Sequence, residues 1–106
     1  MNSEELQVAA FEIILNSGNA RSIVHEAFDA MREGNYALAE EKLKESNDEL
    51  LKAHQSQTHL LQEYAGGKEV NVEIIMVHAQ DHLMTAITFI DLAKEVVAVY
   101  KKMAEK

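Results

Sequence analysis

The side chains best suited to chemistry in this 106-residue chain gather between Val77 and Met84, in the order Val-His-Ala-Gln-Asp-His-Leu-Met. It is the only place where ionisable groups cluster among apolar residues. His78 and His82 stand four residues apart, so a helix would place both on one side. Asp81 follows His78 by one turn. Three kinds of chemistry fit this pattern: a metal site, a polar cluster between subunits, and a nucleophilic histidine.

A metal site is the least favoured of the three. The spacing H-x-x-D-H is similar to the inverted zincin motif H-x-x-E-H, with Asp81 in place of Glu. Such sites need a third ligand and a substrate cleft, and we expect neither in a chain this small. A polar cluster that fixes the register between subunits would explain Asp81. It does not explain His78, because any polar side chain would serve there.

A nucleophilic histidine that carries a phosphoryl group fits His78 slightly better. A neutral imidazole is a good nucleophile at pH 7, since the pKa of histidine lies near about 6.5. One ring nitrogen can accept the phosphoryl group while a hydrogen bond holds the other. Transfer then needs mainly positioning and charge stabilisation. A rigid helix that presents one histidine at an exposed groove meets these needs.

The composition predicts a single all-helical domain that spans residues 1–106. The chain has no cysteine, no proline and four glycines, and a high content of Ala, Glu, Lys and Leu is typical of long helices. A formal net charge of −8 argues against nucleic-acid binding. The longest charge-free apolar run, Leu83–Ile90, is too short to span a bilayer, and no signal segment is visible. We therefore expect a cytoplasmic protein.

Three helices follow from the apolar periodicity and the turn residues. They are expected over Ser3–Glu33, Tyr36–Tyr64 and Asn71–Glu105, with short loops at Gly34-Asn35 and Ala65–Glu69. Short loops between long helices favour antiparallel neighbours, which predicts an up-down-up three-helix bundle. The expected N-terminal caps are Ser3, Asn35 and Asn71.

One apolar seam per helix, with steps of three and four residues, should form the core. In the first helix it is Leu6, Ala10, Ile13, Ser17, Ala20, Val24, Ala27 and Met31. In the second it is Tyr36, Ala39, Leu43, Ser46, Leu50, Ala53, Gln57, Leu60 and Tyr64. In the third it is Met76, Ala79, Leu83, Ala86, Ile90, Ala93, Val97 and Tyr100.

The third helix carries a second seam on its opposite side, which we call the second face: Ile74, His78, Asp81, Thr85, Thr88, Leu92, Val96, Val99 and Met103. A helix that is apolar on two sides must be covered on both. Two partner helices do not easily achieve this, so we expect a second subunit to cover the second face. The alternative is a long neighbour within the chain that wraps around this helix.

The outer face of the second helix reads as a solvated charge ladder. Glu40 with Lys44, and Asp48 with Lys52, are spaced for ion pairs of roughly 0.2–0.5 kcal/mol each. We expect no binding site there. The polar groups late in this helix, His54, Thr58 and His59, are expected to be partly exposed or hydrogen-bonded. Gly18 lies in a weak helical stretch and indicates either close packing or a functional turn.

Val77–Met84 resembles the active-site signature of the enzyme IIA component of the lactose/cellobiose (chitobiose) family of the bacterial phosphoenolpyruvate-dependent sugar phosphotransferase system. Asn16–Ser22, Ala53-His54 and Gln57-Thr58 are also similar to stretches of that family. The resemblance implies a phosphocarrier that accepts a phosphoryl group from the protein HPr and passes it to enzyme IIB, for uptake of a β-linked disaccharide. It implies that His78 is the phosphoryl acceptor and that no organic cofactor is needed.

The same resemblance implies a homotrimer of three-helix protomers, with a structural divalent metal ion held by Asp81 of each subunit at the trimer centre. Three converging carboxylates repel one another unless they are protonated or bind a cation, and Mg²⁺ prefers such oxygens. His82 and Gln80 flank the second face as supporting residues. His82 either orients phospho-His78 or serves as an interface histidine, and we favour the second role.

Two alternative functions remain open on the residues alone. One is a structural or metal-binding helical oligomerisation bundle. The other is a two-component histidine phosphotransfer domain, which also carries one histidine on a helix bundle, although the signature around His78 argues against it.

Overall fold

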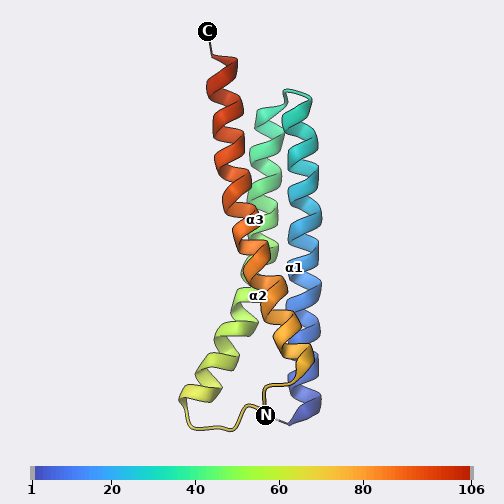
Figure 1. The fold of residues 1–106 in the computed structure, drawn as a ribbon, viewed down its shortest axis with the longest axis vertical. Coiled ribbons are helices and arrows are strands. Elements are labelled where there is room, and N and C mark those ends of the chain that lie inside the picture. The colour runs from blue at the N-terminus through green and yellow to red at the C-terminus, as the bar shows by residue number, and fades with distance from the viewer. Residues whose placement is uncertain (1, 106) are drawn as a thin grey trace.

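The fold is an antiparallel three-helix bundle, as predicted (Figure 1). The computed structural model describes residues 2–105. Helices α1 (Ser3–Arg32), α2 (Tyr36–Ala65) and α3 (Ile74–Ala104) run up, down and up along a rod of 58 × 20 × 18 Å. Among the described residues there is no strand, and no helix is long and apolar enough to cross a membrane.

The N-terminal caps agree with the prediction for one helix out of three. Asn35 caps α2 by accepting a hydrogen bond from the Leu38 amide at 3.1 Å. Helix α1 is capped by Asn2 rather than Ser3, because the Asn2 side chain accepts from the Glu5 amide at 2.8 Å. That amide belongs to the third residue of the helix, where a capping oxygen is expected to reach.

The start of α3 is later than predicted. The helix begins at Ile74, and Glu73 occupies the cap position without a side-chain hydrogen bond, so the expected cap at Asn71 is wrong. The connecting segment is also longer than the predicted loop. It is non-helical over residues 68–73, and Val70 within it is half-buried against the core.

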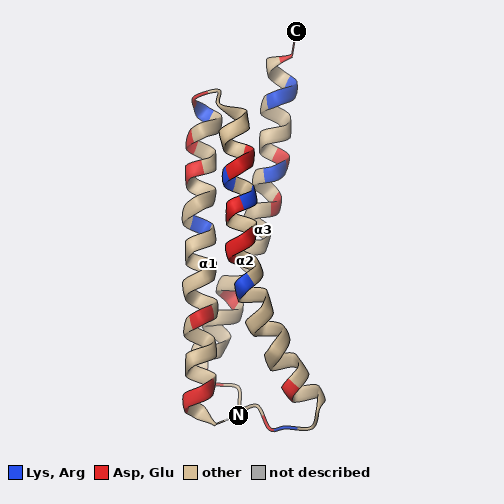
Figure 2. Cartoon of the chain, turned by 180° about the vertical axis from the view of Figure 1, so that it is seen from behind, with Lys and Arg blue, Asp and Glu red and all other residues tan. Residues whose placement is uncertain are grey.

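The predicted seams form the core almost without exception. Every predicted core position of α1 is buried, and so are those of α3 from Met76 to Val97. Tyr36 and Gln57 of α2 and Tyr100 of α3 are half-buried. The exposed exception is Tyr64 of α2, which is 69% exposed, so its predicted core position is wrong. Figures 1 and 2 show the reason, since the last turns of α2 diverge from α1.

The second face of α3 is uncovered within one chain. Ile74, Leu92, Val99 and Met103 are exposed to between 56% and 89%, and Val96 is half-buried. The alternative in which a neighbouring helix of the same chain wraps around α3 is therefore wrong. An apolar stripe of this length on a helix indicates a surface that is covered by another molecule.

Gly18 does not mark a close helix contact. Helix α1 is continuous through it, and a Cβ atom added at Gly18 would meet no atom within 4 Å outside its own stretch of helix. The close-packing interpretation of this glycine is therefore wrong. In contrast, Gly34 has φ +80° in the turn between α1 and α2, a left-handed conformation that favours glycine.

The charges on α2 pair differently from the predicted ladder. Glu40 binds Lys101 of α3 with an Oε1–Nζ distance of 2.7 Å, and Lys52 binds Glu49 at 3.0 Å. Neither predicted i, i+4 pair forms, because α3 brings a competing ammonium group to Glu40 and Glu49 lies one turn from Lys52. Lys44 is thereby left without an ion pair in the described part of the chain.

Candidate functional site

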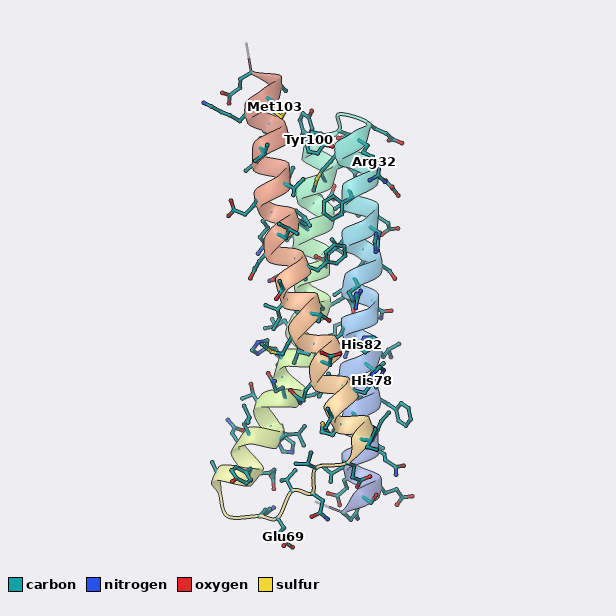
Figure 3. All side chains as sticks on the ribbon, in the orientation of Figure 1. Arg32, Glu69, His78, His82, Tyr100 and Met103 are labelled. Atoms are coloured by element: carbon teal, nitrogen blue, oxygen red, sulfur yellow. The ribbon has the colours of Figure 1, made fainter. Side chains whose placement is uncertain are left out.

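The candidate site lies in the N-terminal half of α3, where the inner face anchors the helix and the outer side carries the histidines. Ala79 and Leu83 are fully buried against the other helices, which fixes the rotation of α3 about its axis. This rotation exposes His78 and leaves His82 half-buried. The two rings meet edge to face, with centroids 4.5 Å apart and an interplanar angle of 79° (Figure 3).

His82 differs from His78 in the surroundings of its ring. The Nδ1 atom of His82 is buried and makes no hydrogen bond within the described residues. Buried polar atoms in proteins are nearly always hydrogen-bonded. The exposed ring of His78, in contrast, is open to a partner from solution.

Gln80 links the site to α2. Its Oε1 atom accepts a hydrogen bond from Gln57 Nε2, and its own Nε2 lies 3.7 Å from the sulfur of Met76. The sequence pattern predicts Gln57 as a core-seam residue of α2 but gives no indication that it bonds Gln80. The available signal was a polar residue at a seam position, since such residues need a bonding partner.

Asp81 is exposed on the second face beside the histidines. Its carboxylate makes no hydrogen bond or ion pair within the described residues, while its backbone oxygen accepts from Thr85 Oγ1 at 2.8 Å. No group of three or more metal-ligating side chains occurs among the described residues. Metal binding by a single chain is therefore not supported, and a metal at Asp81 requires carboxylates from several copies.

The late polar residues of α2 do not join the site. His54, Thr58 and His59 are all exposed, which is the first of the two alternatives that the sequence predicted for them. The Nε2 atom of His59 lies 3.9 Å from Glu63 Oε1. Lys68 Nζ binds Glu63 at 2.9 Å, and this bond holds the pKa of Glu63 below its ordinary value and raises the pKa of Lys68.

The surroundings of His78 suit a protein partner. Val77 and Met84 are each more than half exposed, and Ile74 lies one turn before His78 with 89% of its side chain exposed. Exposed apolar groups around a polar centre are typical of protein–protein contact surfaces. An accessible imidazole on a rigid helix, rimmed by apolar side chains, can exchange a small group with another protein.

Comparisons with known proteins agree on one family. The family model for the lactose/cellobiose-specific IIA subunit of the phosphotransferase system matches residues 8–101. The lichenan-specific phosphotransferase enzyme IIA component of Bacillus subtilis is 44% identical over 98% of this chain and 94% of its own. The crystal structure of PtcA from S. mutans is 76% identical, with a TM-score of 0.94, and the match covers 95% of this chain and 99% of that one.

A further similar structure is IIA(Chitobiose) of Escherichia coli, solved in a complex with HPr. It is 33% identical, with a TM-score of 0.82, over 94% of this chain and 97% of that chain. The long match to the family model and the identity to the lichenan-specific relative are each sufficient to assign the family. This chain belongs to the lactose/cellobiose-specific enzyme IIA family of the sugar phosphotransferase system.

Proposed function

We propose that this chain is a phosphocarrier that accepts a phosphoryl group from phospho-HPr on His78 and passes it to enzyme IIB. The transfer would serve the uptake of a β-linked disaccharide of the lactose, cellobiose or chitobiose type. The observation that carries the proposal is the exposed ring of His78 within the family signature, on a helix whose other side is fully buried.

The chemistry requires little beyond this placement. A neutral ring nitrogen of His78 attacks the phosphorus atom, a nitrogen–phosphorus bond forms, and the bond between phosphorus and the donor atom of HPr breaks. In the second transfer the nitrogen–phosphorus bond of phospho-His78 breaks while a bond forms between phosphorus and the acceptor atom of enzyme IIB. Because such transfers depend mainly on alignment and charge stabilisation, a rigid helix in place of a deep cleft is adequate.

The similarity of this chain to IIA(Chitobiose), which was solved in complex with HPr, supports HPr as the donor. The exposed apolar side chains of Val77 and Met84 beside His78 are of the kind that contact another protein. Enzyme IIB as the acceptor rests on the family alone. His82 supports His78 in the proposal, because its ring restricts one side of the acceptor ring.

We further propose that three copies meet along the second face of α3. The C-terminal half of that face holds an apolar groove of about 440 Å³ lined by Leu92, Val96, Val99 and Met103, among others. Thr85 and Thr88 donate their hydroxyls to backbone oxygens of their own helix, so their methyl groups can face a partner. Such an apolar stripe is long enough for copies of α3 to pack against one another along it.

A structural Mg²⁺ ion at the trimer centre is part of the same proposal. Asp81 fits it in two respects: its carboxylate is exposed on the face that would meet the other copies, and it has no partner among the described residues. Three such carboxylates would supply hard oxygen ligands and would repel one another without a cation. Gln80, held by Gln57, would keep this part of α3 fixed relative to α2.

A transfer assay in two steps tests the function. The chain would be incubated with labelled phosphoenolpyruvate, enzyme I and HPr, and then with a purified enzyme IIB. The proposal predicts label on this chain that moves to enzyme IIB on addition. Label that never appears would support the structural or metal-binding bundle instead. Label accepted only from a phosphorylated response regulator would select the histidine phosphotransfer alternative.

A further inference from the structure

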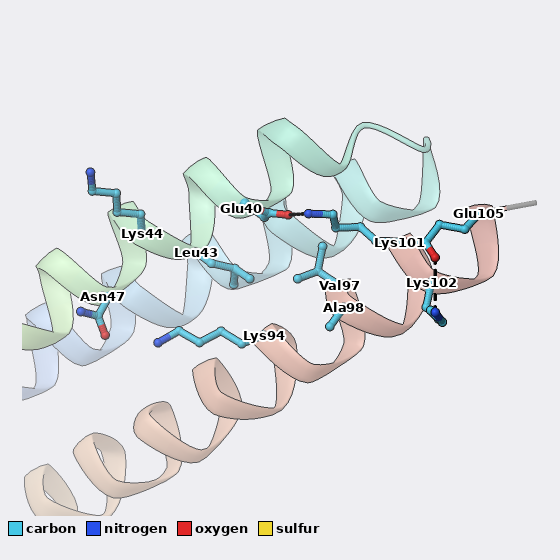
Figure 4. Close-up of a pocket in the computed structure, with 10 residues that line it drawn as sticks. All are labelled: Glu40, Leu43, Lys44, Asn47, Lys94, Val97, Ala98, Lys101, Lys102 and Glu105. Carbon is cyan, nitrogen blue, oxygen red and sulfur yellow. Dashed lines mark hydrogen bonds and ion pairs between the residues drawn. The ribbon is translucent and has the colours of Figure 1, made fainter.

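A cleft between α2 and α3 lies in the half of the bundle that is remote from His78. Its volume is about 650 Å³, within the range of roughly 300–1,000 Å³ typical of small-molecule sites. Leu43, Val97 and Ala98 supply apolar surface, and four lysines stand around them: Lys44, Lys94, Lys101 and Lys102 (Figure 4). Half of the eight lysines of an acidic chain therefore line one cleft.

Two of these lysines are neutralised at one end of the cleft. Lys101 Nζ lies 2.7 Å from Glu40 Oε1, and this bond raises the pKa of Lys101. Lys102 lies 3.4 Å from Glu105. These pairs use both carboxylates that line the cleft, so none remains for the lysines at the other end.

Lys44 and Lys94 occupy that other end, on facing helices (Figure 4). They are the two lysines in the described part of the chain that form neither a hydrogen bond nor an ion pair. Asn47 joins them with a carboxamide that can donate two hydrogen bonds. The chain has eighteen acidic and ten basic residues, yet no carboxylate among the described residues pairs with either of these two ammonium groups.

The charge arrangement favours an anion. An anion bound in the cleft would be attracted by both ammonium groups, and no carboxylate that lines the cleft is left to compete for them. Lysine is a common phosphate ligand that acts as a point charge with three donors. The apolar floor and the volume exceed what a free phosphate ion would fill, so the ligand should also carry an organic group.

We propose that this cleft binds a small phosphorylated organic molecule. The phosphate lies between Lys44 and Lys94 with a hydrogen bond from Asn47, and the organic group packs over Leu43 and Val97. The site is separate from the phosphoryl acceptor: His78 precedes Lys94 by sixteen residues, or about 24 Å along the helix. Binding is therefore independent of the proposed transfer function and can be tested without it.

The test is a two-dimensional NMR titration of the full chain with glucose 6-phosphate, inorganic phosphate and glucose. We expect saturable shifts of amides around Leu43 and Lys94 with glucose 6-phosphate, weaker binding of inorganic phosphate and none of glucose. The double variant Lys44→Gln/Lys94→Gln should bind at least tenfold more weakly. The control Lys52→Gln/Lys68→Gln has the same net charge and should bind like the wild type, and so should His78→Ala.

Three outcomes would overturn the proposal. The first is the absence of a saturable shift at the cleft in the wild type. The second is equal weakening of binding by the two double variants, which would indicate only a general charge effect. Equal affinity for inorganic phosphate and glucose 6-phosphate would mean that the organic group contributes nothing. Circular dichroism of both double variants shows whether the helices are intact before the affinities are compared.

Discussion

The rings of His78 and His82 meet edge to face on the outer side of α3, with their centroids 4.5 Å apart. The ring of His78 is exposed, whereas that of His82 is half-buried and therefore has less freedom to move. A neighbour in contact restricts the orientations of the His78 ring, the proposed acceptor. This relationship is the basis of the first prediction.

Substitution of His82→Ala should slow phosphoryl transfer to His78 by about 10- to 100-fold while the final extent stays the same, because a loosely held acceptor is aligned less often. The measurement is the rate of phosphorylation by phospho-HPr. His82→Phe keeps an aromatic edge and should recover part of the rate. His54→Ala, at an exposed histidine of α2, is the control. An unchanged rate in His82→Ala would remove the positioning role.

Charge on the second face should separate the subunits. Leu92→Glu/Val99→Glu places two carboxylates on the apolar half of that face, where both wild-type side chains are more than half exposed. We expect the mass in solution, measured by light scattering after size exclusion, to fall from a trimer to a monomer. Leu51→Glu alters a similarly exposed leucine on α2 and should leave the mass unchanged. A wild type that is itself a monomer would contradict the trimer.

Removal of divalent metal should destabilise the assembled wild type but not Asp81→Leu. Without a cation the three proposed carboxylates repel, whereas leucine packs without one. The measurement is the thermal midpoint with Mg²⁺ and with a chelator. Asp81→Leu should still be phosphorylated, since Asp81 is assigned a structural role. If Asp81→Leu lost phosphoryl transfer while it remained a trimer, this division of roles between Asp81 and His78 would be wrong.

Gly18→Ala should stabilise the chain by about 0.5–1 kcal/mol, because alanine loses less backbone entropy in a helix. The added Cβ atom meets no atom within 4 Å outside its own stretch of helix. Gly34→Ala is the opposite control, since φ +80° at Gly34 strains any residue with a Cβ. Urea unfolding measures both. A Gly18→Ala variant less stable than the wild type would show that the position is more crowded than the structure indicates.

The bond between Glu63 and Lys68 should stabilise the fold at neutral pH and not in acid. Lys68 holds the pKa of Glu63 below 4.5, so the contribution is fully present above that ordinary value. It is lost as the pH falls through the lowered pKa of Glu63. Lys68→Ala should therefore be less stable than the wild type in urea at pH 7, and the difference should disappear once the solution is acidic enough to protonate Glu63 in the folded state. A difference that persists in strong acid would need another cause.

Sequence periodicity predicted the core well because helix packing depends on it directly. Steps of three and four residues identified eight of the nine buried positions of α1 and missed only Ala30. The second face of α3 is largely exposed, as its pattern predicts. Features that depend on how the helices are arranged in space were harder to predict from the sequence. Tyr64 continues the seam of α2 in sequence, but the last turns of α2 leave α1 and expose it.

The site shows the same division. The signature around His78 was evident in sequence, because its spacing and residue types are specific. The hydrogen bond between Gln57 and Gln80 joins two helices and could not be read from spacing on either one. Likewise, Lys44 was paired with Glu40 by its i, i+4 spacing, whereas α3 brings Lys101 to Glu40 instead. That long-range contact leaves Lys44 without the partner that its spacing predicted.

The most direct test of the central claim is the intact mass of the chain after incubation with phosphoenolpyruvate, enzyme I and HPr. The wild type and the control His54→Ala should each gain the mass of one phosphoryl group, and His78→Ala should gain none. No gain in the wild type would contradict the phosphocarrier function. A gain in His78→Ala would keep the function but contradict the acceptor, and His82 would be the first residue to test in its place.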